Sequence, residues 1–414
     1  MDFLKTYFTY DQLRCIWWLL IGVLMLGWAI TDGFDVGVAM LLKIVGKDDA
    51  ERRVMINSVA PHWDGNQVWL ITAGGAIFAA WPIVYATAFS GLYLAMILVL
   101  MALFFRPLAF EYRSKIESVT WRSAMDWCLS IGSLVPALVI GVAFGNLLQG
   151  VAFDFNSNHN YNSLALGKNI AMPFYHGGIF GNEAGGPFSG FLGLISLLNP
   201  YALLAGLISV LMLAAHGGSF LQLKTADEVR RRSEKVTAYC SIAAAFLFIV
   251  AGVLLLYYVK GYQVVSWHNG ANSPSMPSLS KEVVMGRGLW FSNYHAAPIL
   301  YIFPLLGIAG FLTAAMASRA HWHVLSFLST SIAMFGVVFT AGVTMFPFIM
   351  PSYITPNHSL TMWDATSSYN TLAVMTLVAM VMTPIVLAYT ICCYYVMRGR
   401  LTKDYVQEHS NKLY

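Results

Sequence analysis

The sequence predicts an all-α polytopic membrane protein with nine transmembrane helices. Of its 414 residues, 58% are hydrophobic and only 11% are charged. Soluble domains carry roughly 25% charged residues, so a composition this apolar is typical of a membrane protein. Nine apolar segments are each long enough to cross a bilayer as a helix, which takes about 20 residues. They cover 13–45, 57–80, 83–105, 127–149, 197–222, 237–259, 295–317, 323–349 and 371–397.

The segments and the loops between them predict one integral membrane domain covering residues 1–414. The first segment, 13–45, is longer than a bilayer needs, so we expect it to tilt or to bend near Gly33. Two external loops, 150–196 and 260–294, are longer than the others and rich in Asn, Gly, Ser or Pro, which is typical of surface loops. No internal repeat and no low-complexity tract divides the chain.

The basic residues are distributed unevenly between the two sides of the membrane. Eighteen of the 24 Lys and Arg residues fall on one side, in or beside Lys43, the loops near 46–56, 106–126, 223–236 and 318–322, and the C-terminal tail. Cytoplasmic loops carry an excess of Lys and Arg, so this side is predicted to be cytoplasmic. The N-terminus is then expected in the periplasm and the C-terminus in the cytoplasm, as an odd number of spans requires. The acidic Asp2 and the lack of a small-residue cleavage site favour a retained first span over a signal peptide.

Two groups of polar residues interrupt the first two apolar segments. Asp32 and Asp35 lie within the first segment, whereas His62 and Asp64 lie at the start of the second, in the run Pro61-His62-Trp63-Asp64-Gly65-Asn66-Gln67-Val68-Trp69. An ionisable residue in a spanning helix costs about 2.5–3.5 kcal/mol, so it is rarely kept without a role. Because a helix rises 1.5 Å per residue, Asp35 and Asp64 are expected at similar depths in the cytoplasmic half of adjacent helices.

Two interpretations of these polar residues stay open at this point. In the structural one, Asp32 with Gly33 marks a helix bend, and Asp64 or Asn66 caps the helix that begins after the proline. In the functional one, the acids form a cytoplasmic proton path, because chains of acids and polar groups at mid-depth commonly relay protons. His62 and Asn66 share a helix face. An interfacial hydrogen bond is favoured over metal ligation for His62, and no metal site is predicted.

Other polar residues give weaker signals. His216 and His295 could ligate haem iron, but no pair of histidines faces across convincingly spaced helices. Arg106 is expected at a helix exit, where its side chain can extend to water. Gly141-x-x-x-Gly145 permits close helix packing, and Trp363–Ser368 is expected to form an external helix cap. The five cysteines lack a Cys-x-x-Cys spacing, which predicts neither a disulfide framework nor covalent haem attachment.

Nine motifs spread along the chain together match one known family. They are Arg14–Leu20 (RCIWWLL), Thr31–Asp35 (TDGFD), Ile56–Ser58 (INS), Pro61–Leu70 (PHWDGNQVWL), Phe104–Pro107 (FFRP), Tyr112–Ile116 (YRSKI), Gly141–Asn146 (GVAFGN), Met345–Phe348 (MFPF) and Leu360–Ser368 (LTMWDATSS). On these motifs the chain resembles subunit II of the cytochrome bd-type quinol oxidases over essentially its whole length. The 150–196 loop looks longer than is usual in the family, and no family role transfers to it.

The resemblance implies a fold, partners and cofactors. The expected fold has two four-helix bundles plus one additional helix. The expected partner is subunit I, which carries haem b558, haem b595 and haem d and oxidises ubiquinol or menaquinol. The complex would reduce O₂ to water in the bacterial inner membrane, taking protons from the cytoplasm and generating a proton-motive force without pumping. Small accessory subunits, and a quinone bound to subunit II, belong to the same expectation.

The resemblance also implies roles for particular residues. The acid that matches Asp64 belongs to a proton path towards the haem pair near the subunit interface, and Asp35 is expected in the same path. Trp69 is expected near the haem interface, and Arg106 in the same region. Asp32 and His62 complete the candidate site. The haem ligands themselves are expected in the partner.

An ion-coupled secondary transporter is the alternative hypothesis. Such transporters also use acids near the membrane midplane, in helices broken at Gly or Pro, and their two halves are related. The first half of this sequence has one candidate broken segment, and the second half shows no clear counterpart. The sequence therefore favours the oxidase subunit.

Overall fold

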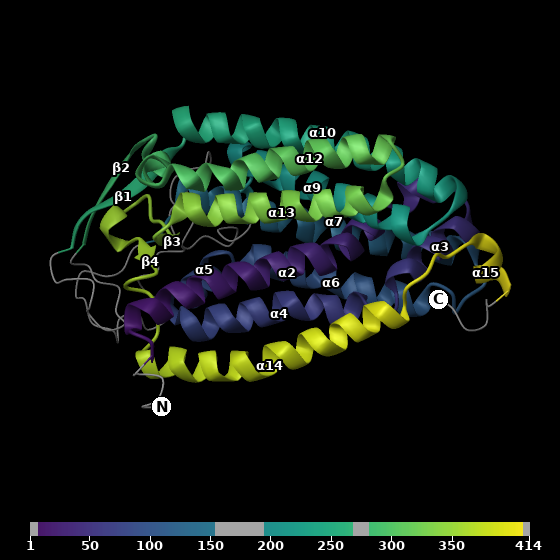
Figure 1. The fold of residues 1–414 in the computed structure, drawn as a ribbon, viewed down its shortest axis with the longest axis horizontal. Coiled ribbons are helices and arrows are strands. Elements are labelled where there is room, and N and C mark those ends of the chain that lie inside the picture. Colours follow the sequence, from purple (N-terminus) through teal and green to yellow (C-terminus); the bar gives the residue numbers. More distant parts are fainter. Residues whose placement is uncertain (1–6, 154–193, 268–280, 409–414) are drawn as a thin grey trace.

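The computed structural model describes residues 7–153, 194–267 and 281–408, and these consist mostly of long helices (Figure 1). The long helices are α2 (Tyr10–Val45), α4 (Trp63–Ala80), α6 (Tyr93–Tyr112), α7 (Val119–Gln149), α9 (Pro200–Lys224), α10 (Asp227–Tyr257), α12 (Ile302–Arg319), α13 (His323–Met345) and α14 (Tyr369–Val396).

Short elements join the long helices. They are α3 (Asp49–Val59), α5 (Pro82–Gly91), α11 (Ser292–Ala296), α15 (Lys403–Glu408), the 3₁₀ turns η2 (Leu289–Phe291), η3 (Pro298–Tyr301) and η4 (Pro356–His358), and the strands β1 (Lys260–Trp267), β2 (Lys281–Arg287), β3 (Phe348–Met350) and β4 (Leu360–Thr361). The strands pair as two antiparallel hairpins, β1 with β2 and β3 with β4. The first hairpin lies in the predicted external loop 260–294, and most of the 150–196 loop lies outside the described residues.

The described helices identify a multi-pass membrane protein. Eight of them are long and apolar enough to cross a membrane, and the count reaches nine if α4 and α5, which meet at a bend of 119°, form one span. This agrees with the number of spans that the sequence predicts. Which end faces the cytoplasm, and the division into two four-helix bundles, stay predictions.

The second and third predicted spans differ from the helices that form. In place of one span over 57–80, the chain makes α3, a turn at residues 60–62 and then α4. In place of one span over 83–105, it makes the short α5, with Pro82 at its first turn, followed by α6. A proline has no backbone N–H to donate, so it fits a first helical turn and interrupts a helix interior. The turn before α4 contains Pro61 and the α4–α5 junction is followed by Pro82, whereas the break between α5 and α6 falls at Leu92, away from any proline.

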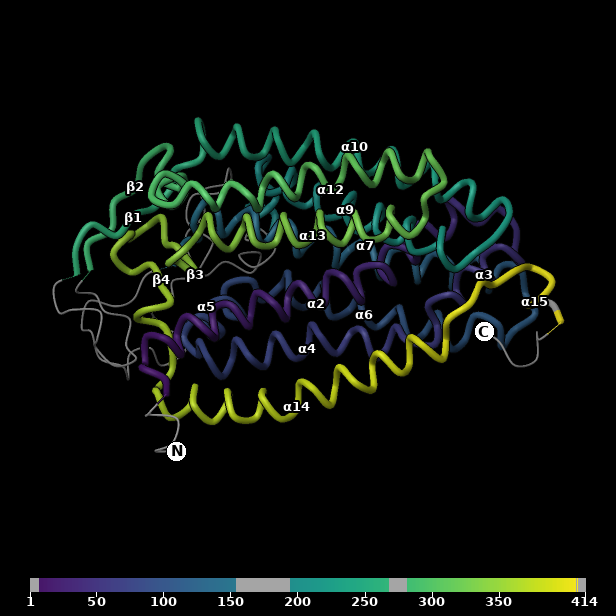
Figure 2. The backbone as a smooth tube through the Cα atoms, viewed as in Figure 1, coloured from purple at the N-terminus to yellow at the C-terminus, as the bar shows by residue number. Residues whose placement is uncertain are grey.

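Helix α2 lies at the centre of the arrangement. It packs against α9, α4, α7, α13 and α14. Figures 1 and 2 show α4 and α14 along one side of α2, and α9, α10, α12 and α13 along the other. The strands and the N-terminal end of α2 lie at one end of the molecule, whereas α3 and α15 lie at the opposite end.

Glycines bring α2 and α9 into backbone contact. A Cβ atom on Gly37 would lie 2.1 Å from the carbonyl oxygen of Leu213, and one on Gly217 would lie 2.4 Å from the backbone of Gly37. Helix α2 runs unbroken through Gly33, so the long first segment is one continuous helix, and its tilt or bend stays a prediction. The Gly141-x-x-x-Gly145 pattern does pack closely, because a Cβ on either glycine would lie 2.7 Å from backbone atoms of α9.

The expected external cap at Trp363–Ser368 is only partly right. Ser368 caps α14 by accepting a hydrogen bond from the N–H of Thr371 at 3.3 Å. Asp364 instead forms a buried ion pair with Lys281 of β2. This ion pair joins the first hairpin to the segment before α14, and no local sequence pattern predicts it because 83 residues separate the partners.

Ion pairs fasten α3 to the C-terminal part of the chain. Glu51 accepts hydrogen bonds from Arg232 of α10 (2.5 Å), from the N–H of Lys47 (2.7 Å) and from Lys403 of α15 (3.0 Å). Burial opposes the ionisation of Glu51, but these donors outweigh it and lower the pKa of Glu51 to about 2. Lys403 also pairs with Asp48 at 2.7 Å and lowers the pKa of that carboxyl.

The lowered pKa of Glu51 predicts a loss of stability in acid. A carboxyl with a depressed folded-state pKa stabilises the fold above its unfolded pKa, which is about 4.3 for Glu, and this contribution disappears as the pH falls towards 2. The melting temperature of the purified complex should therefore fall between pH 5 and pH 3. Glu51→Gln should flatten this dependence, whereas Glu228→Gln, at an exposed one-turn ion pair with Arg231, should not. An unchanged dependence in Glu51→Gln would refute the assignment.

Candidate functional site

The buried acid Asp32 is neutralised by Arg106. Both side chains are almost inaccessible to solvent, with 1% and 0% of their surface exposed. The guanidinium of Arg106, on α6, binds the carboxylate through two hydrogen bonds of 2.6 and 3.1 Å. The indole N–H of Trp28 donates a third, at 2.9 Å. Asp32 is thus fully paired and held in place.

The position expected for Arg106, at a helix exit with its side chain extending to water, is wrong. The predicted third span ended at residue 105, but α6 continues to Tyr112, so Arg106 lies inside the helix. Its charge is balanced by Asp32 and not by solvent. A buried ion pair of this kind adds little stability compared with apolar side chains, but losing one partner leaves an uncompensated buried charge.

Asp35 lies one turn further along α2, in different surroundings. It is fully buried and accepts a hydrogen bond from the side-chain amide of Asn66 at 2.7 Å. Its other oxygen, Oδ1, has no hydrogen-bond partner among the described residues, although Nδ1 of His62 lies 3.4 Å away. No Lys or Arg in the described part of the chain forms an ion pair with Asp35. Of the two buried acids, Asp35 is the one with an oxygen available to a proton.

Asn66 connects the acid to a third helix. Its amide nitrogen donates the hydrogen bond to Asp35, and its amide oxygen accepts a hydrogen bond of 2.6 Å from the hydroxyl of Tyr394 on α14. The ring of His62 lies between Phe34, edge-on at 5.4 Å, and Tyr394, at 5.2 Å between ring centres. His62 and Asn66 share a face, as predicted. Tyr394 was not foreseen, because it is 328 residues away from Asn66 in sequence.

Asp64 lies on a different face of α4 from these groups. It is two residues from both His62 and Asn66, which places it about 200° around the helix from each. Its side chain is exposed and forms no hydrogen bond or ion pair with any residue that the structure describes. The structure therefore groups Asp32, Asp35, His62 and Arg106, and leaves Asp64 on the outer surface.

Trp69 follows the same helix towards the other end of the molecule. Its ring packs against α2 where Gly27 leaves room, because a Cβ on Gly27 would lie 2.5 Å from the ring. Trp69 thus helps to set the spacing between α4 and α2, the helix that carries both buried acids.

A haem iron ligand must present a free ring nitrogen. His216 is fully buried, but its Nδ1 lies 2.8 Å from the hydroxyl of Thr330 and its Nε2 lies 2.9 Å from the carbonyl oxygen of Ile30. Both nitrogens are engaged, and His295 is exposed. His216 therefore does not fit an iron ligand.

A second cluster of charged residues joins α3 to its neighbouring helices. Arg113 binds Asp126 at 2.6 Å and Asp49 at 2.8 Å, and Arg52 binds the same Asp126 at 3.2 Å. These ion pairs join α3 and α7 to the C-terminal end of α6. Taken together, the chain is a multi-pass helical membrane protein with charged residues paired inside its helix layers.

Comparisons with known proteins place this arrangement in a family. The family model described as cytochrome bd terminal oxidase subunit II matches residues 13–397. The chain is 49% identical to the cytochrome bd-I ubiquinol oxidase subunit 2 of Escherichia coli (strain K12), over 98% of this chain and 99% of the relative. It is 30% identical to the cytochrome bd ubiquinol oxidase subunit 2 of Bacillus subtilis (strain 168), over 94% of this chain and 97% of the relative.

A solved structure shows the same fold. The bd oxidase of Geobacillus thermodenitrificans aligns with a TM-score of 0.58 over 93% of this chain and 96% of that chain, at 11% identity. The chain belongs to the cytochrome bd terminal oxidase subunit II family. It is therefore a subunit of a respiratory oxidoreductase complex that contains haem and a subunit I, and the family match decides against the transporter hypothesis.

Proposed function

We propose that this chain pairs with a haem-bearing subunit I in the bacterial inner membrane and conducts protons from the cytoplasm while the complex reduces O₂ to water. Subunit I would hold haem b558, haem b595 and haem d, and ubiquinol or menaquinol would supply the electrons. Small accessory subunits complete the proposed assembly. The proposal is supported by the relatives, which are named as ubiquinol oxidase subunits.

The outer face of α4 is the proposed contact with subunit I. Asp64, Val68 and Ile71 are spaced so that they share one helix face. Val68 and Ile71 are 46% and 67% exposed, so Asp64 lies at the end of an apolar stripe. An acid in that position is costly against lipid. It is more easily accommodated against a protein partner that supplies water or a polar group.

The proposed proton path begins at Asp64 on the partner-facing side of α4 and ends at His62 and Asp35, with water or polar groups at the subunit contact joining the two faces of the helix. The observation that carries it is the state of Asp35, a fully buried carboxyl with an unbonded oxygen 3.4 Å from an imidazole nitrogen. A proton on His62 Nδ1 can move to Asp35 Oδ1 over that distance after a small side-chain movement. Asp32 is not proposed as a carrier, because both of its oxygens are hydrogen-bonded to Arg106. It sets the local charge.

Replacing Asp64 by Asn is expected to lower quinol oxidase turnover at least about tenfold, because Asn keeps the size of the side chain but cannot carry the proton. O₂ consumption by the purified complex measures this, and the haem absorption spectrum shows whether the complex is intact. Glu228→Gln, a similar change at an exposed acid on α10, should leave turnover unchanged. Wild-type turnover in Asp64→Asn, with a normal haem spectrum, would exclude Asp64 from the path.

A further inference from the structure

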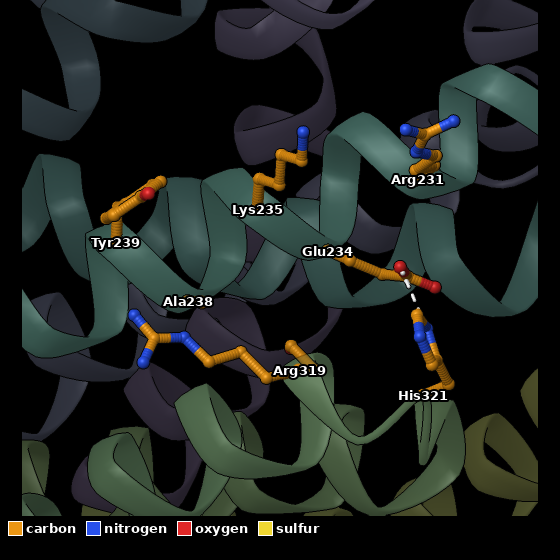
Figure 3. A pocket seen from close by; sticks show the side chains of 8 residues that line it. Arg231, Glu234, Lys235, Ala238, Tyr239, Arg319 and His321 are labelled. Atoms are coloured by element: carbon orange, nitrogen blue, oxygen red, sulfur yellow. Dashed lines mark ion pairs between the residues drawn. The ribbon is translucent and has the colours of Figure 1, made fainter.

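Two histidines and a glutamate meet at the start of α10, far from the acid cluster in sequence. Glu234 lies two turns into α10, and His321 and His323 flank the turn between α12 and α13. Nδ1 of His321 lies 3.0 Å from one carboxylate oxygen of Glu234, and Nε2 of His323 lies 2.8 Å from the other. Figure 3 shows His321 directed at Glu234 across the gap between the helices.

The backbone of the turn aims His321 at this carboxylate. His321 has a φ of +60°, in the left-handed region where glycine is the usual residue after a helix. The N–H of Trp322 donates to the carbonyl of Ala317 at 2.8 Å, and that of His321 donates to Ser318 at 3.4 Å, which is the pattern of a Schellman motif. A histidine takes up this conformation less readily than glycine. Its side chain gains the contact with Glu234.

We propose that Glu234, His321 and His323 bind a divalent transition-metal ion of the zinc class. One carboxylate and two imidazoles are ligands that suit Zn²⁺, with water in the fourth position. The three ligand atoms already lie within 4.8 Å of one another. A tetrahedral ion with bonds of about 2.1 Å needs them about 3.4 Å apart. The His321 and His323 nitrogens lie 3.0 and 2.8 Å from the carboxylate, which is already near that spacing. The side chain of His321 is 71% exposed, so its ring has room to rotate towards the required spacing.

The surroundings allow the ion and its water to enter. A cavity of about 250 Å³ adjoins the cluster and is lined by Arg231, Lys235, Tyr239 and Arg319 among others. In Figure 3 the side chains of Lys235 and Arg319 extend away from the Glu234–His321 pair. Arg231 pairs with Glu228 at 3.3 Å. These cations weaken the attraction for a dication but do not block the ligand atoms.

The chemistry of the ligands makes binding depend on pH. Each imidazole must be neutral to offer its lone pair to a metal, so Zn²⁺ competes with protons for the ring nitrogens. The bound ion would fasten α10 to the first residue of α13. This site is separate from the proposed proton path, and it can be tested without measuring turnover.

Zinc binding to the purified oxidase complex tests the site directly. Equilibrium dialysis against Zn²⁺ at pH 7.5 should show that the wild-type complex binds one equivalent more than His323→Ala or Glu234→Gln. In either variant the affinity of this site should fall at least tenfold, because loss of even a supporting partner costs about 10–100-fold. His295→Ala, at an exposed histidine elsewhere, should bind as the wild type does. Lowering the pH to 5.5 should release the same single equivalent.

A further variant controls for the possibility that zinc binding is lost through misfolding. His321→Ala changes an exposed residue, so the complex should assemble normally and still lose the zinc. Zn²⁺ should also raise the melting temperature of the wild-type complex, since a ligand that binds only the folded state stabilises it. It should not raise that of the variants. Equal zinc binding by wild type, His321→Ala and His323→Ala would overturn the proposal, and so would the absence of zinc binding by the wild type.

Discussion

Asp35→Asn is expected to reduce O₂ consumption with quinol by about 100-fold, while the haem spectrum stays that of the wild type. Asn has the shape of Asp and can still accept the hydrogen bond from Asn66, so the helices should pack as before. It removes only the carboxylate oxygen that is 3.4 Å from His62. Losing a positioned proton carrier typically costs about 10²–10⁴ in rate. Proton uptake by the complex in liposomes should fall in parallel.

The controls for this prediction separate chemistry from assembly. Asp35→Glu restores a carboxyl and should recover part of the activity. Asp404→Asn makes the same substitution at an exposed acid on α15 and should have no effect. If Asp35→Asn oxidised quinol at the wild-type rate with its haems in place, protons would have to reach subunit I by a route that avoids this carboxyl. A variant that lost its haems would be uninformative on transport and is detected by the spectrum.

Arg106→Met should destabilise the subunit by about 3–5 kcal/mol, because Asp32 would remain as a buried charge without its partner. Methionine keeps much of the length of arginine, so the loss of charge dominates the effect. The expected result is a large fall in the melting temperature of the purified complex, or a failure to assemble it.

Removing the second charge as well should restore stability. The double variant Asp32→Asn with Arg106→Met should be more stable than Arg106→Met alone, and a double-mutant cycle gives the coupling energy of the pair. Arg122→Ala breaks the partly exposed ion pair with Asp49 and should cost no more than about 1 kcal/mol. A double variant as unstable as Arg106→Met would show that the guanidinium does something other than neutralise Asp32.

Helical periodicity and apolar length account for what could be foreseen. The number of spans follows from runs of apolar residues, and the shared face of His62 and Asn66 follows from their spacing of four. The mutual proximity of Asp35 and Asn66 needed only the assumption that neighbouring spans pack together. That assumption holds because consecutive helices are usually neighbours in space.

Other features depend on contacts that no local pattern encodes. The apolar run 83–105 predicts Arg106 at a helix exit, but the break at Leu92 shifts this helix to Tyr93–Tyr112 and leaves Arg106 inside it. The sequence predicts Asp35 and Asp64 at similar depths, but similar depth does not bring the side chains together when Asp64 lies on the other face of α4. Tyr394 contacts Asn66, which is 328 residues away in sequence, and Lys281 contacts Asp364, which is 83 residues away. The fold alone brings them together.

The hydrogen bond from Tyr394 to Asn66 has a consequence for how the subunit is made. Helices α2 and α4 leave the ribosome early, whereas Tyr394 lies near the end of α14, the last of the long helices. Until α14 is inserted, Asn66 lacks the donor that occupies its amide oxygen, and the aromatic side of His62 lacks its neighbour. The acid cluster is therefore completed only when α14, the last of the long helices, is in place. A chain that stops before α14 would contain Asp35 but would lack the contacts of Tyr394 with Asn66 and His62. A truncated subunit therefore differs from a complete one at the acid cluster itself.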